Sequence, residues 1–223
     1  MNRALKFAKL DFTTIKPYLS LKNMLIFLFV FAFIGYSSGN PSTMIGMMMM
    51  YATLYVSYPF AVGDKNGIDT LYCTLPISKK DVVIGRYIFS LLLNLIVGAI
   101  AFIASALLMT TRGGFNGQET FMVVLLCVAL FTTVQAIQLP IYFKLGYAKA
   151  KLLAYIPFIA FPAIIVMISA YLGEKNMMRY LESIFSQIQA NIFITALIAA
   201  VIWGLVMGVS GMLSYRFYRK REI

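Results

Sequence analysis

Apolar residues fall in long runs along this chain, and short polar connections separate the runs. Runs of about 20 apolar residues match the length of a helix that crosses the hydrocarbon core of a bilayer. The pattern therefore predicts an all-α polytopic membrane protein, with a single transmembrane domain over residues 1–223. Its six membrane-spanning helices are expected over residues 18–36, 43–62, 81–110, 120–139, 152–172 and 191–215.

Two further segments have the pattern of amphipathic helices that lie in the membrane surface. The first covers residues 1–16 and ends before Pro17, and the second covers residues 173–190 and is expected on the outer leaflet. The apolar stripe of the first comprises Met1, Leu5, Ala8, Phe12 and Ile15, with Phe7 and Leu10 off the stripe. The stripe of the second comprises Met177, Leu181, Ile184 and Ile188.

Prolines and glycines mark the places where spans should stop, bend or pack closely. The fourth span is expected to stop at Pro140. Pro157 and Pro162 should bend the fifth span, which is either a pathway-lining helix or a kinked packing helix. In the last span, Gly204 and Gly208 have the small-xxx-small spacing that permits close helix approach, and we expect packing within the chain in preference to dimerisation.

Composition supports the membrane assignment, and the placement of charged residues orients the spans. Hydrophobic residues make up 61% of the chain, against roughly 45–50% in an ordinary soluble domain. The net charge of +11 does not indicate a nucleic-acid partner, because the basic residues lie in the short connections. Of the 19 Lys and Arg residues, all except Arg112, Lys175 and Arg179 fall on one side of the six-span arrangement. Cytoplasmic loops are enriched in Lys and Arg, so both termini are predicted to be cytoplasmic.

The predicted spans contain few side chains that could couple transport to ions or catalyse a reaction. Their centres offer only Ser, Thr, Asn and Gln, and the deepest charged residues, Asp81 and Arg86, are expected at the cytoplasmic mouth of the third span. Ion-coupled transport is disfavoured, because it usually needs ionisable groups near the midplane. An intramembrane enzyme is also disfavoured, since the chain has no histidine and its carboxylates lie near the membrane edges or beyond. Cys73 and Cys127 form neither a disulfide framework nor a metal site.

Energy for transport would have to come from a partner. The chain has no Gly-x-x-x-x-Gly-Lys-Ser/Thr loop for nucleotide phosphates. ATP-driven transport would therefore require a separate ATPase that binds the cytoplasmic connections, and no cofactor is expected in this chain.

The connection over residues 63–80 is the most informative polar segment. Ile68, Leu71, Tyr72 and Leu75 have helical spacing there. A short helix over residues 67–74 would offer this face to a partner or lay it on the membrane surface. The helix should end before Pro76, because a residue that precedes proline resists the helical conformation. Ser78 with Asp81 then predicts a capping box at the start of the third span.

Three sequence features resemble exporter-type ABC-transporter permeases, particularly the small six-span bacterial permeases of the phenol-soluble modulin exporter and of lantibiotic-immunity transporters. The first is the surface helix before the first span. The second is the connection with Asp64-Lys-Asn-Gly-Ile-Asp69 and Leu75-Pro-Ile-Ser-Lys-Lys-Asp81. The third is Tyr142-Phe-Lys-Leu-Gly-Tyr147, after the fourth span.

The resemblance implies a division of roles along the chain. In that family the loop helix is a coupling helix docked into an ATPase subunit, which holds ATP and Mg, and two permeases with two ATPases form the transporter. Carried over, the ATPase-coupling residues are Gly67, Ile68, Asp69, Thr70, Leu71 and Tyr72. A secondary cytoplasmic contact, within residues 142–151, would involve Tyr142, Lys144 and Tyr147.

The resulting hypothesis is a permease subunit of an ATP-driven exporter in the bacterial plasma membrane, which pairs with a second copy or a similar permease. Its pathway would be lined by Met, Phe, Tyr and small polar groups, so an amphipathic peptide is the first expected substrate and lipid the second. A non-transporting scaffold that anchors a cytoplasmic partner is the alternative.

Overall fold

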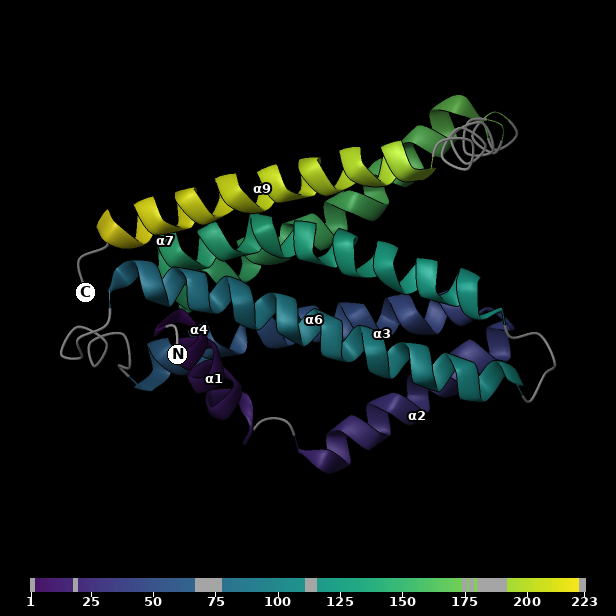
Figure 1. The fold of residues 1–223 in the computed structure, drawn as a ribbon, viewed down its shortest axis with the longest axis horizontal. Helices are drawn as coiled ribbons and strands as arrows, with labels where there is room; N and C mark the ends of the chain where they lie inside the picture. The colour runs from purple at the N-terminus through teal and green to yellow at the C-terminus, as the bar shows by residue number, and fades with distance from the viewer. Residues whose placement is uncertain are drawn as a thin grey trace.

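The computed structural model describes residues 3–17, 20–66, 78–110, 116–173, 176, 179 and 192–220. Every regular element in these residues is a helix, and the long helices form an elongated bundle (Figure 1). The all-α prediction is thus confirmed for the described chain. The helices are α1 (Arg3–Ile15), α2 (Leu21–Ser38), α3 (Pro41–Val56), α4 (Tyr58–Asn66), α6 (Lys79–Thr110), α7 (Gly117–Leu172) and α9 (Ile192–Lys220).

Four stretches of the described chain are long and apolar enough to cross a membrane, namely Pro41–Asp64, Lys79–Thr110, Gly117–Pro157 and Ile194–Lys220. The apolar part of α2, Lys22–Ser38, is shorter. The 32 residues of α6 extend roughly 48 Å, beyond the bilayer core of about 30 Å. The prediction that the third span projects from the membrane is consistent with this length.

The second predicted span is divided into two helices. α3 ends at Val56, Ser57 makes the turn, and α4 starts at Tyr58. Pro59 is tolerated because it lies in the first turn of α4, where a backbone N–H has no helical acceptor. α4 continues to Asn66, so residues 63–66 are helical and the predicted connection over residues 63–80 was too long at its start.

The fourth span does not stop at Pro140, so that prediction was wrong. The helix continues to Leu145, and the only non-helical residue inside α7 is Gly146, with φ 73° and ψ 171°. We call residues 117–145 the first arm of α7 and residues 147–172 the second arm. Gln138 Nε2 donates to the Ala154 carbonyl oxygen at 2.7 Å, so the arms fold back on each other. The basic stretch over residues 141–151 is therefore a helical hairpin, and the backbone stays helical through Pro157 and Pro162.

The buried face of α1 differs in part from the predicted stripe. Ala4, Phe7 and Ala8 are buried, whereas Leu5 is exposed. Gly85 on α6 permits this contact, because a Cβ atom there would lie 2.9 Å from the Ala4 carbonyl oxygen and from Phe7. The predicted stripe was therefore right for Ala8, Phe12 and Ile15 but wrong in including Leu5 and excluding Phe7, and α1 is held by protein contacts.

The glycines of α9 also differ from expectation. A Cβ atom added at Gly204, Gly208 or Gly211 would meet no atom within 4 Å. The prediction that they pack within the chain was therefore wrong for the described residues, and this side of α9 is open. The predicted outer helix over residues 173–190 lies outside the described residues, apart from Gly173 and residues 176 and 179.

Candidate functional site

The predicted coupling segment lies outside the described residues, including Gly67, Ile68, Asp69, Thr70, Leu71 and Tyr72. The structure does describe the two helix ends that flank it, Asn66 at the end of α4 and Lys79 at the start of α6. Both lie at the end of the bundle that holds α1 and the last turns of α9 (Figure 1). The packing around these two ends therefore connects the predicted coupling segment to the rest of the bundle.

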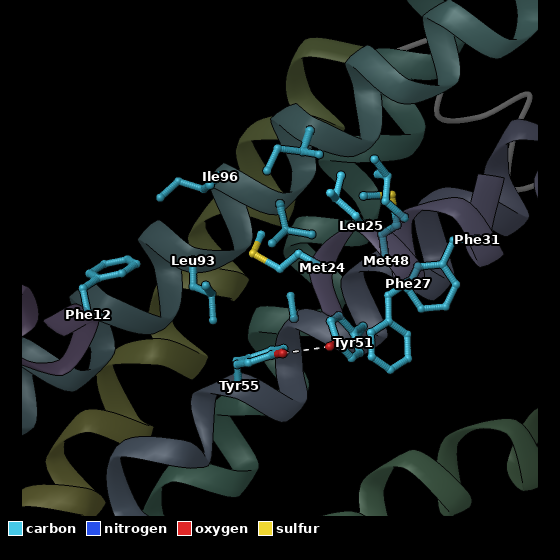
Figure 2. A pocket seen from close by; sticks show the side chains of 14 residues that line it. Phe12, Met24, Leu25, Phe27, Phe31, Met48, Tyr51, Tyr55, Leu93 and Ile96 are labelled. Atoms are coloured by element: carbon cyan, nitrogen blue, oxygen red, sulfur yellow. Dashed lines mark hydrogen bonds between the residues drawn. The ribbon is translucent and has the colours of Figure 1, made fainter. Parts of the chain in front are cut away.

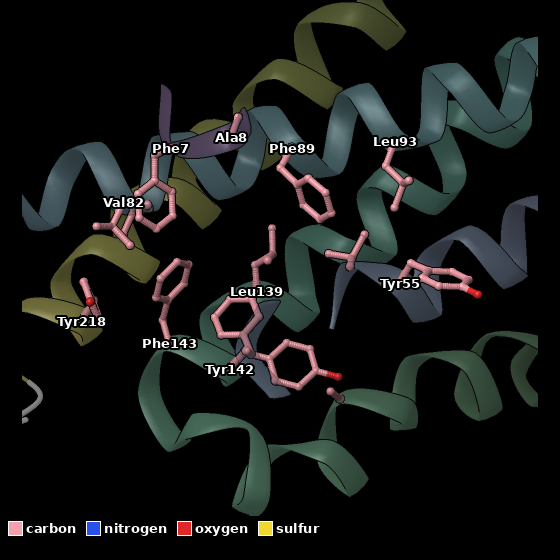
Figure 3. Packing of buried hydrophobic residues seen from close by; sticks show 14 of the residues in the cluster. Phe7, Ala8, Tyr55, Val82, Phe89, Leu93, Leu139, Tyr142, Phe143 and Tyr218 are labelled. Atoms are coloured by element: carbon pink, nitrogen blue, oxygen red, sulfur yellow. The ribbon is translucent and has the colours of Figure 1, made fainter. Parts of the chain in front are cut away.

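Aromatic rings join α4, α7 and α9 at this end (Figure 3). Phe60 of α4 stacks on Tyr142 with ring centroids 5.0 Å apart and meets the edge of Phe143 at 5.1 Å. Phe143 in turn meets Tyr218 of α9 at 5.3 Å. We call these four rings, together with Phe7 and Phe89, the end cluster; all six side chains are buried. α4 cannot move far without displacing rings from two other helices.

A buried ion pair lies beside the end cluster. Asp11 Oδ2 of α1 is 3.8 Å from Arg86 Nε of α6, and neither atom has a hydrogen-bond partner in the described chain. The Arg86 guanidinium carbon lies 3.8 Å from the centroid of the Phe60 ring, within cation–π range. Burial raises the pKa of Asp11 to about 7, and the charge of Arg86 opposes that rise. The pair links α1 to α6, and the arginine links α6 to α4.

The α7 hairpin is fixed to α4 by a carboxylate. Asp64 Oδ2 accepts a hydrogen bond from the Ala148 N–H at 3.0 Å, at the start of the second arm. A negative charge is favourable there, because the first N–H groups of a helix are unpaired and the helix dipole is positive at that end. Asp64 thus ties the last turn of α4, directly before the predicted coupling segment, to the hairpin.

The three predicted secondary-contact residues have different surroundings on this hairpin. Tyr142 is buried and stacks on Phe60, so it holds α4 in place. Lys144 is exposed, with its Nζ 5.1 Å from the centroid of the Phe217 ring, and Tyr147 is half-buried. Contact of this hairpin with an ATPase stays a prediction, and the side chains available for it are those of Lys144 and Tyr147.

On the other side of the predicted coupling segment, α6 begins with a capped first turn. Ser78 Oγ accepts from the Asp81 N–H at 3.1 Å and donates to Asp81 Oδ2 at 2.7 Å, which confirms the predicted capping box. Lys79 Nζ donates to the Arg219 carbonyl oxygen at 3.5 Å and lies 5.6 Å from the centroid of the Tyr218 ring. The start of α6 is thereby attached to the end of α9.

A polar network lies deeper in the bundle, between α3, α6 and α7. The Gln135 Oε1 atom accepts from Ser90 Oγ at 2.5 Å and from Asn94 Nδ2 at 2.7 Å, while Gln135 Nε2 donates to Thr53 Oγ1 at 3.1 Å. All four side chains are buried. These four polar residues of the predicted spans are therefore satisfied by one another, and each of the three bonds joins two different helices.

A second polar contact explains the helical Pro140. Proline has no N–H, so the Ala136 carbonyl, four residues earlier, has no helical donor. Ser210 Oγ of α9 donates to this carbonyl. Tyr87 of α6 lies 2.5 Å from Ser210 Oγ and 2.8 Å from Ser214 Oγ. Because Ser210 donates its hydroxyl proton to the Ala136 carbonyl oxygen, the Tyr87 hydroxyl donates to Ser210 Oγ and accepts from Ser214 Oγ.

An apolar pocket of about 280 Å³ opens between α2, α3 and α6, with Phe12 of α1 at one end (Figure 2). Its polar feature is a pair of hydroxyls, because Tyr51 and Tyr55 on α3 hydrogen-bond at 2.7 Å. Met24, Met48 and Leu93 are among the lining residues. The pocket suits a hydrocarbon group. Among the described residues, no group of three His, Cys, Asp or Glu side chains could hold a metal ion.

Asp11, Asp64 and Gln135 are site residues that sequence reasoning missed. A signal existed for Asp11, because it shares helical spacing with Ala4, Ala8 and Ile15, and a carboxylate on an apolar stripe needs a partner. No comparable signal existed for Asp64, whose partner lies 84 residues away in sequence, or for Gln135, whose partners lie 41, 45 and 82 residues away.

A sequence profile described as "ABC-2 family transporter protein" matches residues 7–219, which include every helix of the bundle at least in part. No curated protein matches the chain. The match agrees with the resemblance to ABC-transporter permeases at family level. The finer resemblance to phenol-soluble modulin and lantibiotic-immunity permeases stays a prediction.

Proposed function

The chain belongs to the ABC-2 transporter family, as a multi-pass membrane permease of an ABC transporter, and from this premise we propose that it exports an amphipathic substrate with energy from a separate ATPase subunit. The observation that carries the proposal is the end cluster. Around this cluster, both helix ends that flank residues 67–74 are attached to other helices, through Asp64, Phe60 and Lys79. A push on the coupling segment would therefore reach α6, α7 and α9 together.

The mechanism follows from these attachments. Closure of two ATPase subunits, which hold ATP and Mg, moves the segment with Ile68, Asp69, Leu71 and Tyr72. α4 transmits the displacement through Phe60 to the α7 hairpin and through Arg86 to α6. The bundle then shifts between inward-facing and outward-facing arrangements, each stabilised by a different state of the ATPase.

The proposed topology is six spans with both termini in the cytoplasm of a bacterial cell. Reversal of α7 at Gly146 supports it, because the two arms of α7 join α2, α3 with α4, α6 and α9 as spanning segments. The basic residues then gather on the side of α1, where the ATPase would bind. A second copy of the chain, or a similar permease, would complete the transporter.

An amphipathic peptide is the leading substrate, and a lipid is the alternative. The pocket lined by Met24, Met48 and Tyr51 supports this choice, because it is apolar and carries hydroxyls but no charged side chain. A polar or ionic substrate would need buried charges or hydrogen-bonding groups along its path.

Reconstitution with the ATPase that copurifies with the tagged permease tests the proposal. In proteoliposomes we expect the complex to hydrolyse ATP faster when an amphipathic peptide is added, and to move that peptide across the bilayer. Tyr72→Ala should weaken both activities, whereas Tyr171→Ala, at an exposed tyrosine of the second arm, should preserve them. If the ATPase binds but its rate of ATP hydrolysis does not change when peptide is added, and no peptide crosses the bilayer, the chain is a scaffold instead.

A further inference from the structure

A groove of about 390 Å³ runs between α6 and α9. One stripe of each helix lines it, with Ile84 and Tyr87 from α6 and Gly208, Gly211 and Tyr215 from α9. Ile84 and Tyr215 are also exposed. The groove is thus open to whatever surrounds the bundle, which at this depth is the membrane.

The floor of the groove is fixed, and no described side chain fills its interior. Tyr87 is hydrogen-bonded to Ser210 and Ser214, so the two helices are held together beneath the groove. Above this contact, a Cβ atom at Gly208 or Gly211 would meet no atom within 4 Å. The glycines therefore leave space along α9 that no described side chain of the protein fills.

One end of the groove is positively charged. Lys80 lines that end and is exposed, and in the described part of the chain it has no carboxylate partner. Arg219 is also exposed and continues the stripe of Gly211 and Tyr215 at intervals of four residues. The bond from Lys79 to the Arg219 carbonyl shows that the two helix ends are adjacent. The nearby Asp81 is engaged by Ser78.

The length of the groove matches half a bilayer. The wall from Lys80 to Leu91 spans roughly 16 Å of helix axis. Half of a bilayer hydrocarbon core is about 15 Å. A single acyl chain that starts at the headgroup level beside Lys80 would therefore reach the far end of the groove near the bilayer midplane.

We propose that this groove binds one anionic phospholipid as a resident of the permease, with an acyl chain along Gly208 and Gly211 and the phosphate on Lys80 and Arg219. Cationic pockets between transmembrane helices select anionic headgroups, because the charges meet at the low-dielectric edge of the membrane. The chain fills the space between α6 and α9 that side chains leave open. This site is separate from the apolar pocket between α2, α3 and α6 and does not depend on the identity of the exported substrate.

Native mass spectrometry of the purified full chain in detergent tests the site, with phosphatidylglycerol and phosphatidylcholine of identical acyl chains as probes. We expect phosphatidylglycerol to bind more tightly. Lys80→Gln should lower its affinity about fivefold, the factor expected for one cationic side chain at a membrane surface, and leave phosphatidylcholine binding unchanged. Gly211→Leu should lower the affinity of both lipids at least about tenfold, because the leucine occupies the space of about two methylene groups of the chain.

Matched controls separate the groove from general effects. Gly204→Leu places the same side chain on an open part of α9 that does not line the groove, and Lys22→Gln removes an exposed lysine from α2. Both should retain wild-type lipid affinity. Equal losses in Lys80→Gln and Lys22→Gln, or in Gly211→Leu and Gly204→Leu, would overturn the proposal.

The alternative occupant of the groove is a second copy of the chain. Light scattering on the same samples tests for it by measuring the oligomeric mass. If Gly211→Leu changes the oligomeric state and leaves phosphatidylglycerol binding intact, the groove holds a second copy of the chain and the lipid proposal is wrong. If Gly211→Leu does not fold, as judged by the thermal transition of Trp203 fluorescence, the comparison of Lys80→Gln with Lys22→Gln still decides.

Discussion

Asp11 on α1 and Arg86 on α6 place their Oδ2 and Nε atoms 3.8 Å apart, and both side chains are almost completely buried. The arginine also lies against Phe60 of α4, the helix that precedes the predicted coupling segment in sequence. Burial disfavours the ionised carboxylate of Asp11 more than the charge of Arg86 favours it, so the pKa of Asp11 is raised. The position of α1 on the bundle is therefore expected to respond to the charge of Asp11.

The first prediction concerns the pH dependence of stability. Burial raises the pKa of Asp11 from an ordinary value of 3.8 to about 7. Between those values the folded state binds a proton that the unfolded state has released, so the stability contributed by this group falls as pH rises through the window. Asp11→Asn removes the titration, and we expect its unfolding temperature, followed by Trp203 fluorescence in detergent, to change less with pH than that of the wild type.

Glu119→Gln is the matched control for this experiment, because Glu119 is an exposed carboxylate near the opposite end of the bundle. Its unfolding temperature should follow the wild-type pH profile between about pH 4 and pH 8. An Asp11→Asn profile that also parallels the wild type would show that Asp11 does not titrate in this range in the folded protein.

The second prediction concerns the contact between Ser210 and Ala136. Ser210→Ala leaves the Ala136 carbonyl without a donor, and we expect a loss of about 1 kcal/mol in the free energy of unfolding. Pro140→Ala restores an N–H that can bond to this carbonyl, so in that background Ser210→Ala should be less destabilising. Denaturant unfolding of the four proteins in the double-mutant cycle gives the coupling energy.

Ser105→Ala provides the reference for losing a buried serine hydroxyl. Among the described residues, Ser105 Oγ bonds only within its own helix, to the Phe102 carbonyl, so its loss should have a small effect. Additive effects of Pro140→Ala and Ser210→Ala would mean that Ser210 does not replace the donor that proline lacks.

The outcome at Pro140 shows why parts of the fold escaped prediction. Proline ends a helix only when no other group satisfies the freed carbonyl, and the group that does so here lies 74 residues away in sequence. The buried face of α1 was hard to predict for the same reason, because the space for Phe7 is created by Gly85 on another helix. Helical character and the capping box of Ser78 depend on residues close together in sequence, and these were predicted correctly.

The third prediction tests the polar network centred on Gln135. Gln135→Leu preserves the size of the side chain and removes the bonds to Ser90, Asn94 and Thr53. We expect a loss of about 1–2 kcal/mol in the free energy of unfolding, because three helices share this network and its groups stay buried. Circular dichroism during denaturant unfolding measures the change. Gln118→Leu, at an exposed position of the first arm, should stay within about 0.5 kcal/mol of the wild type.

The last prediction concerns the reversal at Gly146. Its φ of 73° and ψ of 171° lie in a region that only glycine populates readily. Gly146→Ala should therefore lower the free energy of unfolding by about 1–3 kcal/mol, while Gly204→Ala, on an open helical face, should raise it slightly. Asp64→Ala removes the acceptor for the Ala148 N–H and should lower it by about 1 kcal/mol. Because Asp64 and Gly146 build the same turn beside Lys144 and Tyr147, both destabilising variants should also reduce peptide-stimulated ATP hydrolysis in the reconstituted complex, more than Gly204→Ala does. Wild-type stability in Gly146→Ala would mean that the two arms of α7 join through a different backbone geometry.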